Sequence, residues 1–345
     1  MIRGLIVFII TSSLIACAPK DSDETASGGR KGPTYPGPAE TEYCSTSKTF
    51  ADPITVSGTA VYNRRVIWGN LTAGGLGSAS TTASSHPASQ NPIRRAEIRV
   101  TDPSGAVVQC AETDGSGAFS FTLPRGAVSY TISVNSRSYN QYLRASVLNA
   151  PERNQFYSLK TTCTATGACS VGTLIAGADG ELLGGAFNIL DQLHHANDYL
   201  RSKVSTCNSL YNGCRDVTTT NPVPKVVAYW EKGFNPNSYF GGTSGLSFYL
   251  PGYSRLFILG GQDGDVNNSD TDHFDNPVII HEYGHFLEDV VGRSDSPGGS
   301  HNGNKVIDPR LAWSEGWGNF FQATVIAYYD PSGPTVGRYV DSVAR

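Results

Sequence analysis

Alternating apolar and polar positions in the first half of the chain predict half-buried β-strands. Residues 54–62 show this pattern most fully, with side chains of opposite character at successive positions, as a strand with one buried face requires. Turn sequences such as Asp102-Pro103-Ser104-Gly105 separate the apolar runs. Further strands are predicted at residues 96–101, 107–110, 118–123 and 130–134. The pattern therefore predicts an all-β unit over residues 43–160, interrupted by a long surface loop at 69–91.

The second half of the chain has a mixed pattern of helices and strands. Residues 186–200 carry apolar side chains at steps of three and four, which is the spacing of a helix with one buried face. Strands are predicted at 226–230 and 246–250, and two apolar stretches, 278–287 and 311–321, predict buried helices. Helix, strands and two further helices in that order indicate an α+β unit.

The first of these two buried helices contains the sequence His281-Glu282-Tyr283-Gly284-His285. Histidines four residues apart on a helix lie on the same face, one turn apart, and can bind one Zn2+ ion together. The glutamate between them can reach a metal-bound water. The alternative is a structural helix with two incidental histidines. The spacing favours a zinc site with His281 and His285 as ligands and Glu282 as the general base.

The second buried helix offers a third zinc ligand. Glu315 lies in sequence among Trp313, Trp317 and Phe320, and these surroundings favour a metal ligand over a capping or salt-bridge carboxylate. Two histidines and one glutamate leave the fourth zinc position open, which is the catalytic pattern. Asn319 follows one turn later on the same face, where it is expected to orient a ligand histidine through its second ring nitrogen.

Two glycines, Gly316 and Gly318, interrupt this same helix. Each costs roughly 1 kcal/mol relative to alanine inside a helix. A missing side chain lets two backbones draw together, so we expect this helix to approach the histidine helix closely.

The complete motif, His281-Glu282-x-x-His285 followed by Glu315-Gly316, resembles the gluzincin metallopeptidases, the broad thermolysin-like group. The resemblance runs from about residue 224 to 329 and implies one zinc ion, a peptide or protein substrate and endopeptidase activity through a zinc-activated water. It also implies an edge-strand hairpin, here 237–241 and 256–261, that aligns the substrate main chain. The substrate-binding residues would then be Ser238, Tyr239 and Phe240.

One part of the gluzincin pattern lacks a clear counterpart. These families place a tyrosine or histidine beyond the glutamate helix, where it stabilises the oxyanion. Tyr328, Tyr329 and His301 are the candidates, and the sequence does not rank them. This gap leaves a second function open, a surface binding or adhesion lipoprotein with a catalytically weak peptidase-like domain.

The first-half strands resemble the carboxypeptidase regulatory-like, transthyretin-like β-sandwich. The residues that carry this resemblance are Ala96, Ile98, Val100, Thr113, Asp114, Gly117, Phe119 and Phe121. Such domains are mostly spacers or binding platforms. The expected fold is therefore a transthyretin-like all-β sandwich at 43–160, followed by an α+β zincin metallopeptidase domain at 161–345.

The first residues have the pattern of an export signal. Residues 1–16 join a positively charged start to an apolar stretch too short for a permanent membrane span. Leu14-Ile15-Ala16-Cys17 resembles the bacterial lipobox, which implies cleavage before Cys17 and lipid attachment to it; a plain secretory signal is the alternative. Ala18 favours the outer membrane, so we expect a lipid-anchored protein of the bacterial cell envelope. Residues 17–42 are polar and predict a flexible tether.

Composition and cysteine usage agree with export. Charged residues make up 16 % of the chain, below the ~25 % of an average domain. The net charge of −4 without a basic stripe argues against nucleic acid as a partner. Besides Cys17, six cysteines suggest three disulfides. Fifteen pairings are possible, and sequence proximity favours Cys44–Cys110, Cys163–Cys169 and Cys207–Cys214.

Two further clusters carry weaker signals. Residues 263–272 are rich in oxygen ligands that suit Ca2+, but they lack the closing glutamate of an EF-hand, so a solvated acidic loop is preferred and no calcium is assigned. His194 and His195 are adjacent, which places them about 100° apart on a helix, and they are expected to be packing or surface residues. Nothing in the sequence indicates an oligomeric state.

Overall fold

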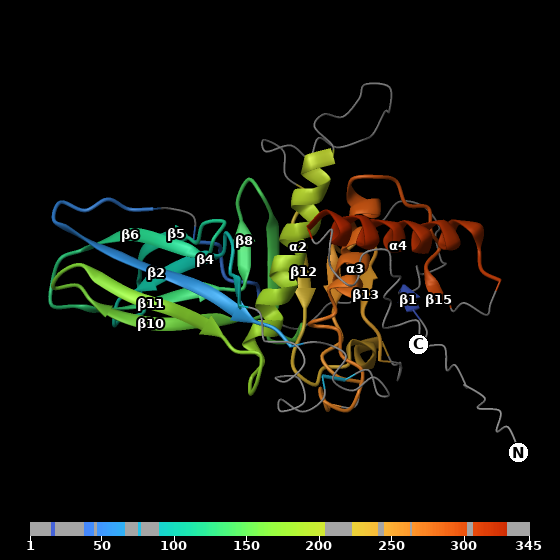
Figure 1. Ribbon diagram of the computed structural model, residues 1–345, viewed down its shortest axis with the longest axis horizontal. Coiled ribbons are helices and arrows are strands. Elements are labelled where there is room, and N and C mark those ends of the chain that lie inside the picture. The colour runs from blue at the N-terminus through green and yellow to red at the C-terminus, as the bar shows by residue number, and fades with distance from the viewer. Residues whose placement is uncertain are drawn as a thin grey trace, which may run out of the picture.

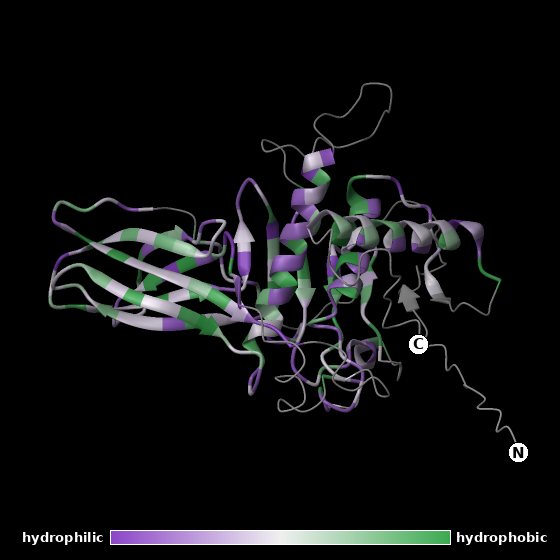
Figure 2. Cartoon of the chain, in the orientation of Figure 1, coloured by the Kyte–Doolittle hydropathy of each residue, from purple (hydrophilic) through white to green (hydrophobic). Residues whose placement is uncertain are grey.

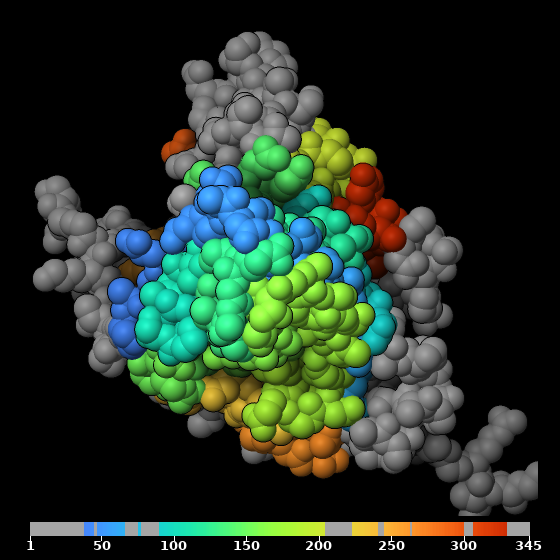
Figure 3. Space-filling view, turned by 90° about the vertical axis from the view of Figure 1, so that its left-hand side faces the viewer, coloured from blue at the N-terminus to red at the C-terminus, as the bar shows by residue number. Residues whose placement is uncertain are grey.

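The computed structural model describes residues 15–17, 38–44, 47–65, 75–76, 90–203, 223–240, 245–262, 264–301 and 306–329. Within these residues the fold is mixed and mostly β, with several sheets and three α-helices. Figure 1 shows a β-rich half on the left and a half that contains the helices on the right. Viewed from the β-rich end, the strands of that half lie in front of the rest of the molecule (Figure 3).

Two four-stranded sheets make up the β-rich half. The first runs in the order β10 (Ser158–Thr164), β7 (Ser129–Asn135), β4 (Glu97–Thr101) and β5 (Val107–Glu112). In the second, β2 (Pro53–Asn63) pairs with β11 (Cys169–Ala176), β3 (Gln90–Pro92) and β6 (Ala118–Pro124). The five strands predicted from alternation are β2, β4, β5, β6 and β7, and these predictions are confirmed.

Alternation along β2 becomes alternating burial. Ile54, Val56 and Tyr62 are buried and belong to the same core cluster as Ile98 of β4 in the other sheet. Figure 2 shows hydrophobic positions alternating with hydrophilic ones along these strands. Removal of apolar side chains from water is the main favourable term that holds the two sheets together.

A third sheet lies in the half that contains the helices. Its strand order is β13 (Phe248–Leu250), β14 (Arg255–Phe257), β12 (Val226–Tyr229), β9 (Arg144–Leu148) and β8 (Arg137–Tyr139). Strand β12 runs parallel to both of its neighbours, whereas β13 and β8 at the edges are antiparallel to theirs. The strands predicted at 226–230 and 246–250 correspond to β12 and β13.

The strand pairing crosses the expected domain boundary at residue 160 in both directions. Strands β8 and β9 precede this residue but belong to the third sheet, and β11 follows it but pairs with β2. Residue 160 itself lies inside β10. It therefore does not separate the sheets, because the alternation along a strand identifies its buried face but not its partner.

The helices α2 (Leu183–Lys203), α3 (Asn276–Val290) and α4 (Pro309–Tyr329) match the three predicted helical stretches. A 3-10 helix, η2 (Pro236–Phe240), follows β12, and a short strand, β15 (Gly299–His301), pairs with β1 (Ile15–Cys17). Helix α3 contacts α2, α4 and the edge strand β13. None of the helices in the described part of the chain has the length and apolar character that a membrane span needs.

Helix α2 joins the two halves through charged contacts. Asp191 accepts hydrogen bonds from the Tyr62 hydroxyl of β2 and from Arg94, both at 2.7 Å, and Asp198 pairs with Arg95 at 2.8 Å. The two acidic residues are seven positions apart, so they lie on the same face of the helix, and this face contacts the β-rich half. The contacts fix the orientation of α2 relative to β2.

The adjacent histidines of α2 are packing residues, as expected. His194 is buried, and its Nε2 lies 2.9 Å from the Ser138 hydroxyl. Burial lowers the pKa of His194 well below its ordinary value, which keeps the imidazole neutral. The ring of His195 stacks on that of Tyr329 in α4, with 4.1 Å between ring centroids.

Two of the three favoured disulfides are present. Cys44 is bonded to Cys110, and Cys163 to Cys169. The first ties the chain ahead of β2 to strand β5, and the second links the consecutive strands β10 and β11. Cys207, Cys214 and most of the loop predicted at 69–91 lie outside the described residues.

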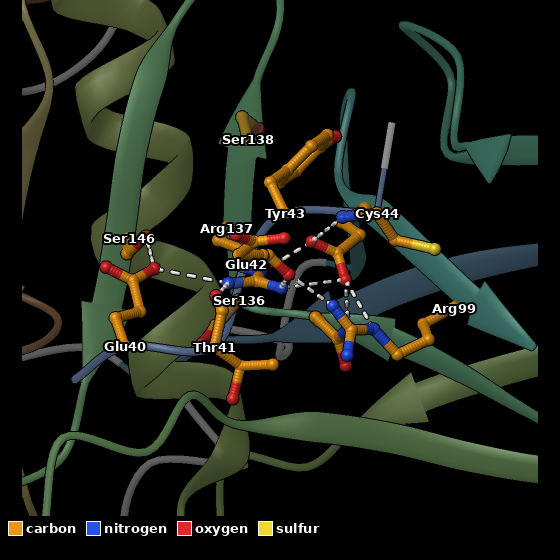
Figure 4. A network of polar contacts seen from close by, with 12 residues as sticks. Glu40, Thr41, Glu42, Tyr43, Cys44, Arg99, Ser136, Arg137, Ser138 and Ser146 are labelled. Atoms are coloured by element: carbon orange, nitrogen blue, oxygen red, sulfur yellow. Dashed lines mark hydrogen bonds and ion pairs between the residues drawn. The ribbon is translucent and has the colours of Figure 1, made fainter. Parts of the chain in front are cut away.

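A buried ion network holds the segment ahead of Cys44 against the folded body (Figure 4). Arg137 of β8 is bidentate to Glu97 of β4, with its Nε 2.5 Å and its Nη2 3.0 Å from the carboxylate oxygens. The same guanidinium donates to the carbonyl oxygens of Thr41 and Glu42. Residues 41 and 42, assigned to a flexible tether by their composition, are therefore bound to the body. The rest of the expected signal and tether, apart from 15–17 and 38–40, lies outside the described residues.

The Arg137–Glu97 pair is expected to matter strongly for stability. Both side chains are buried, so Arg137→Ala leaves the Glu97 carboxylate without its main partner in a region that excludes water. We expect the free energy of unfolding, measured in urea, to fall by about 3–5 kcal/mol. The matched control is Asp52→Ala, which breaks an exposed pair with Arg125 and should change it by less than about 1 kcal/mol. Equal losses of unfolding free energy in the two variants would contradict a special contribution of the buried Arg137–Glu97 pair.

Candidate metal centre

Helix α3 places two histidines and a glutamate in the interior. The helix begins after Asp275, whose side chain accepts a hydrogen bond from the Val278 amide and so caps the first turn. His281 and His285 lie one turn apart on the same face, and their Nε2 atoms are 2.9 Å apart. Both imidazoles are buried, together with Glu282.

Helix α4 brings Glu315 to the same point. One carboxylate oxygen lies 3.3 Å from the Nε2 of His281, and the other lies 3.5 Å from the Nε2 of His285. A tetrahedral zinc ion with bonds of about 2.0–2.1 Å places its ligand atoms about 3.3 Å from one another. The three side chains offer ligand atoms within 4.8 Å of each other, so the group has the size and chemistry of a metal site. This is the only such group among the described residues.

The close approach of α4 to α3 depends on glycine. A Cβ atom on Gly318 would lie 2.8 Å from the His281 Cε1 and 2.9 Å from its Nδ1, closer than real Cβ contacts. On the other helix, a Cβ atom on Gly284 would lie 3.4 Å from the Gly318 Cα. The expected reason for a glycine in this helix is thus confirmed for Gly318. Gly316 is exposed, with no atom near its added Cβ, and its presence is not explained by packing.

Glu282 lies beside the two histidines with a free carboxylate oxygen. Its side chain is buried, and its Oε2 has no hydrogen-bond partner among the described residues. Burial raises the pKa of this carboxyl, while the nearby imidazoles and a hydrogen bond from the Tyr249 backbone of β13 lower it. Glu282 is therefore held between the metal-binding group and the edge strand of the third sheet, where it can accept a proton.

The residue that contacts the second ring nitrogen of His285 is Ser314, which sequence reasoning missed. Its hydroxyl lies 3.2 Å from the His285 Nδ1. Asn319, which was expected in such a role, is half-buried, and its side-chain oxygen accepts a hydrogen bond from Gln322. The available signal for Ser314 was its position directly before the predicted ligand Glu315.

The expected substrate hairpin is not present in its described residues, 237–240 and 256–261. Ser238, Tyr239 and Phe240 lie in the 3-10 helix η2, because the Asn235 side chain accepts a hydrogen bond from the Asn237 amide and turns the chain. The Tyr239 hydroxyl donates to Glu152 on the surface. The second predicted hairpin strand, β14, is an interior strand, so the edge of this sheet is β13 instead.

The proposed oxyanion residues of α4 lie away from the metal centre. Tyr328 is thirteen residues after Glu315, which is about 20 Å along a helix. Its ring packs against Tyr199 of α2, and the neighbouring Tyr329 stacks on His195. Both tyrosines thus serve helix packing and do not reach the candidate site. His301 lies in β15, and its side chain is outside the described part.

The oxygen-rich loop after β14 uses its acidic groups to shape turns. Asp265 accepts hydrogen bonds from the amides of Asn267 and Asn268, and Asp272 accepts one from the Ser247 hydroxyl. Hydrogen bonding lowers the pKa of Asp265, as expected for a charged turn residue. Asp272 is buried, so this end of the loop is not solvated as the sequence suggested.

No known protein family, curated protein or solved structure matches this chain. The site is therefore interpreted from its own geometry and from the motif.

The two glycines of α4 provide a test of the metal centre. We expect Gly318→Ala to weaken zinc binding by about tenfold or more, because the added methyl group forces the His281 ring out of place. Gly316→Ala adds a methyl group in open space, so zinc affinity should stay unchanged while stability rises by up to about 1 kcal/mol. Competition with a fluorescent zinc chelator and thermal unfolding measure the two effects. Equal zinc affinity in both variants would argue against close contact at His281.

Proposed function

We propose that this protein is a zinc-dependent metallopeptidase of the gluzincin type, whose fold joins a transthyretin-like sandwich to a zincin domain. The observation that carries the proposal is the convergence of the buried side chains of His281, His285 and Glu315 from α3 and α4, with Glu282 beside the histidines. Two histidines and one carboxylate are the protein ligands typical of a catalytic zinc ion, which keeps a fourth position for water or substrate.

The metal ion and Glu282 have separate roles in the proposed reaction. When bound, zinc supplies Lewis-acid activation of a water molecule and of the scissile carbonyl. Glu282 takes a proton from the attacking water and later passes it to the leaving amine. Its side chain is buried, and its Oε2 has no hydrogen-bond partner among the described residues. This supports the role because that oxygen is available to accept a proton.

Strand β13 supports a peptide as the substrate. It is the edge strand of the third sheet and contacts α3, and the backbone of its residue Tyr249 hydrogen-bonds Glu282. The residues of β13 are buried and β1 contacts this strand, so its edge would become available once β1 moves away or is removed. A free strand edge can pair with an extended peptide through main-chain hydrogen bonds. A substrate bound in this way would pass directly beside the proton acceptor. We therefore assign the alignment of the substrate to β13 in place of the residues of η2.

A second candidate function is that of a surface binding or adhesion lipoprotein with weak catalysis. The position of Tyr328 and Tyr329 against α2 favours it, since neither can stabilise an oxyanion at the metal centre.

Substitution of the proton acceptor separates these functions. We expect Glu282→Gln to retain stoichiometric zinc and to lower kcat for casein-derived peptides by about 10²- to 10⁴-fold, because the amide cannot accept the proton. The control His285→Ala should lose zinc and activity together. Metal analysis and peptide hydrolysis are the measurements. A wild-type protein that carries zinc but cleaves no peptide would support the binding function, and one that binds no zinc would overturn the metallopeptidase.

We also propose that the chain is anchored in the bacterial outer membrane through Cys17. The support is the lipobox-like sequence of residues 14–17. Several acyl chains on one cysteine give stable attachment to a bilayer. Cleavage before Cys17 would remove Ile15 and Ala16, so the pairing of β1 with β15 would then belong to the precursor.

Lipid attachment is tested by expression in a bacterial host with radiolabelled palmitate. The wild-type protein should incorporate the label and sediment with membranes, because the acyl chains partition into the bilayer. Cys17→Ser should be unlabelled and should migrate more slowly, since it keeps its signal peptide. Cys44→Ser is the control for a cysteine outside the lipobox and should remain labelled. An unlabelled wild type would contradict the anchor.

A further inference from the structure

The second ring nitrogen of His285 belongs to a three-residue hydrogen-bonded chain. The Ser314 Oγ lies 3.2 Å from the His285 Nδ1 and donates a hydrogen bond of 2.5 Å to the Glu288 Oε2. Ser314 and His285 are buried, and the Glu288 side chain is only 10 % exposed. The chain is therefore shielded from most of the water that would otherwise exchange with its hydrogen bonds.

The proton count of this chain settles the direction of each bond. A serine hydroxyl has one proton, and an ionised carboxylate can only accept. The Ser314 proton is used in the short bond to Glu288, so towards His285 the serine oxygen can only accept. The proton of the neutral imidazole must then be on Nδ1, which leaves the lone pair on Nε2. That nitrogen is the one that faces His281 and Glu315.

We propose that Ser314 and Glu288 are positioning residues that select the Nδ1–H tautomer of His285 and hold its Nε2 ready to bind the metal. This inference rests on the proposed zinc function and deepens it. Ligand histidines commonly donate their other ring proton to a fixed acceptor, which sets the ring orientation and raises its basicity as a ligand. Here the acceptor is a serine hydroxyl whose own proton is held by a carboxylate.

The serine is required because the carboxylate alone is too far away. The His285 Nδ1 is 3.9 Å from the Glu288 Oε2, which is longer than a hydrogen bond. Glu288 lies three residues after His285 on α3, and Ser314 directly precedes Glu315 on α4. Each helix therefore provides at least one proposed metal ligand and one positioning residue. The contact between α3 and α4 that assembles the ligand set also assembles this chain.

The test measures zinc affinity and the histidine tautomer on the full chain. We expect Ser314→Ala to weaken zinc binding by about 10- to 100-fold in a chelator competition, and Ser314→Thr to restore it because threonine keeps the hydroxyl. The matched control is Ser296→Ala, which removes a hydroxyl that lines the same small cavity, and it should bind zinc as the wild type does.

The tautomer provides a readout that a merely structural role would not change. In the zinc-free full chain, ¹⁵N spectra of labelled histidine should show the Nδ1–H form for His285. Glu288→Ala frees the Ser314 proton to point at Nδ1, so the population should move towards the Nε2–H form, and zinc affinity should fall. This variant also keeps the inference testable if Ser314→Ala fails to fold.

The outcomes separate the two proposals. If Ser314→Ala and Glu288→Ala bind zinc as tightly as the wild type and keep its tautomer, the positioning role is wrong while the zinc site stands. If the wild-type chain itself binds no zinc, the proposed function is overturned.

Discussion

The contact between α3 and α4 is the constraint on which the candidate site depends. At this contact, Gly318 leaves out a side chain that would collide with the His281 ring, and Gly284 of the facing helix packs against the Gly318 backbone. Because the backbones approach so closely, the short side chain of Glu315 reaches the Nε2 atoms of both histidines. The geometry of the candidate ligand set is thus fixed by two helices, which hold side chains more accurately than loops do.

The rest of the fold supports α3 from its other sides. The third sheet presents the edge strand β13, whose backbone contacts Glu282, and α2 packs on α3 while its Asp191 binds Arg94 and Tyr62 of the β-rich half. Strands from both sides of residue 160 contribute to one continuous core. The β-rich half is therefore joined to the half that contains the helices by shared packing, in addition to the buried Arg137–Glu97 pair.

Local patterns predicted the elements well and their partners poorly. The alternation in β2 and the helical spacing in α2 report the burial of one face, which depends on nearby residues alone. The histidine motif and Glu315 were likewise found in the sequence, and the structure brings them together. Errors arose where a side chain redirected the backbone, as Asn235 does before η2, or where distance along a helix removed Tyr328 from the site.

The sequence by itself determined which residues can bind a metal, because four-residue spacing on a helix places two imidazoles on one face whatever surrounds them. It also determined most strands and helices, and it identified the cysteines that form the two disulfides seen. Only the tertiary structure decided that Glu315 lies beside the two histidines and that Ser314 and Glu288 form a hydrogen-bonded chain with His285. It also decided that β13 is the edge strand at the site. These are contacts between segments far apart in the chain, and their distances follow from how the helices and sheets pack, which no local pattern encodes.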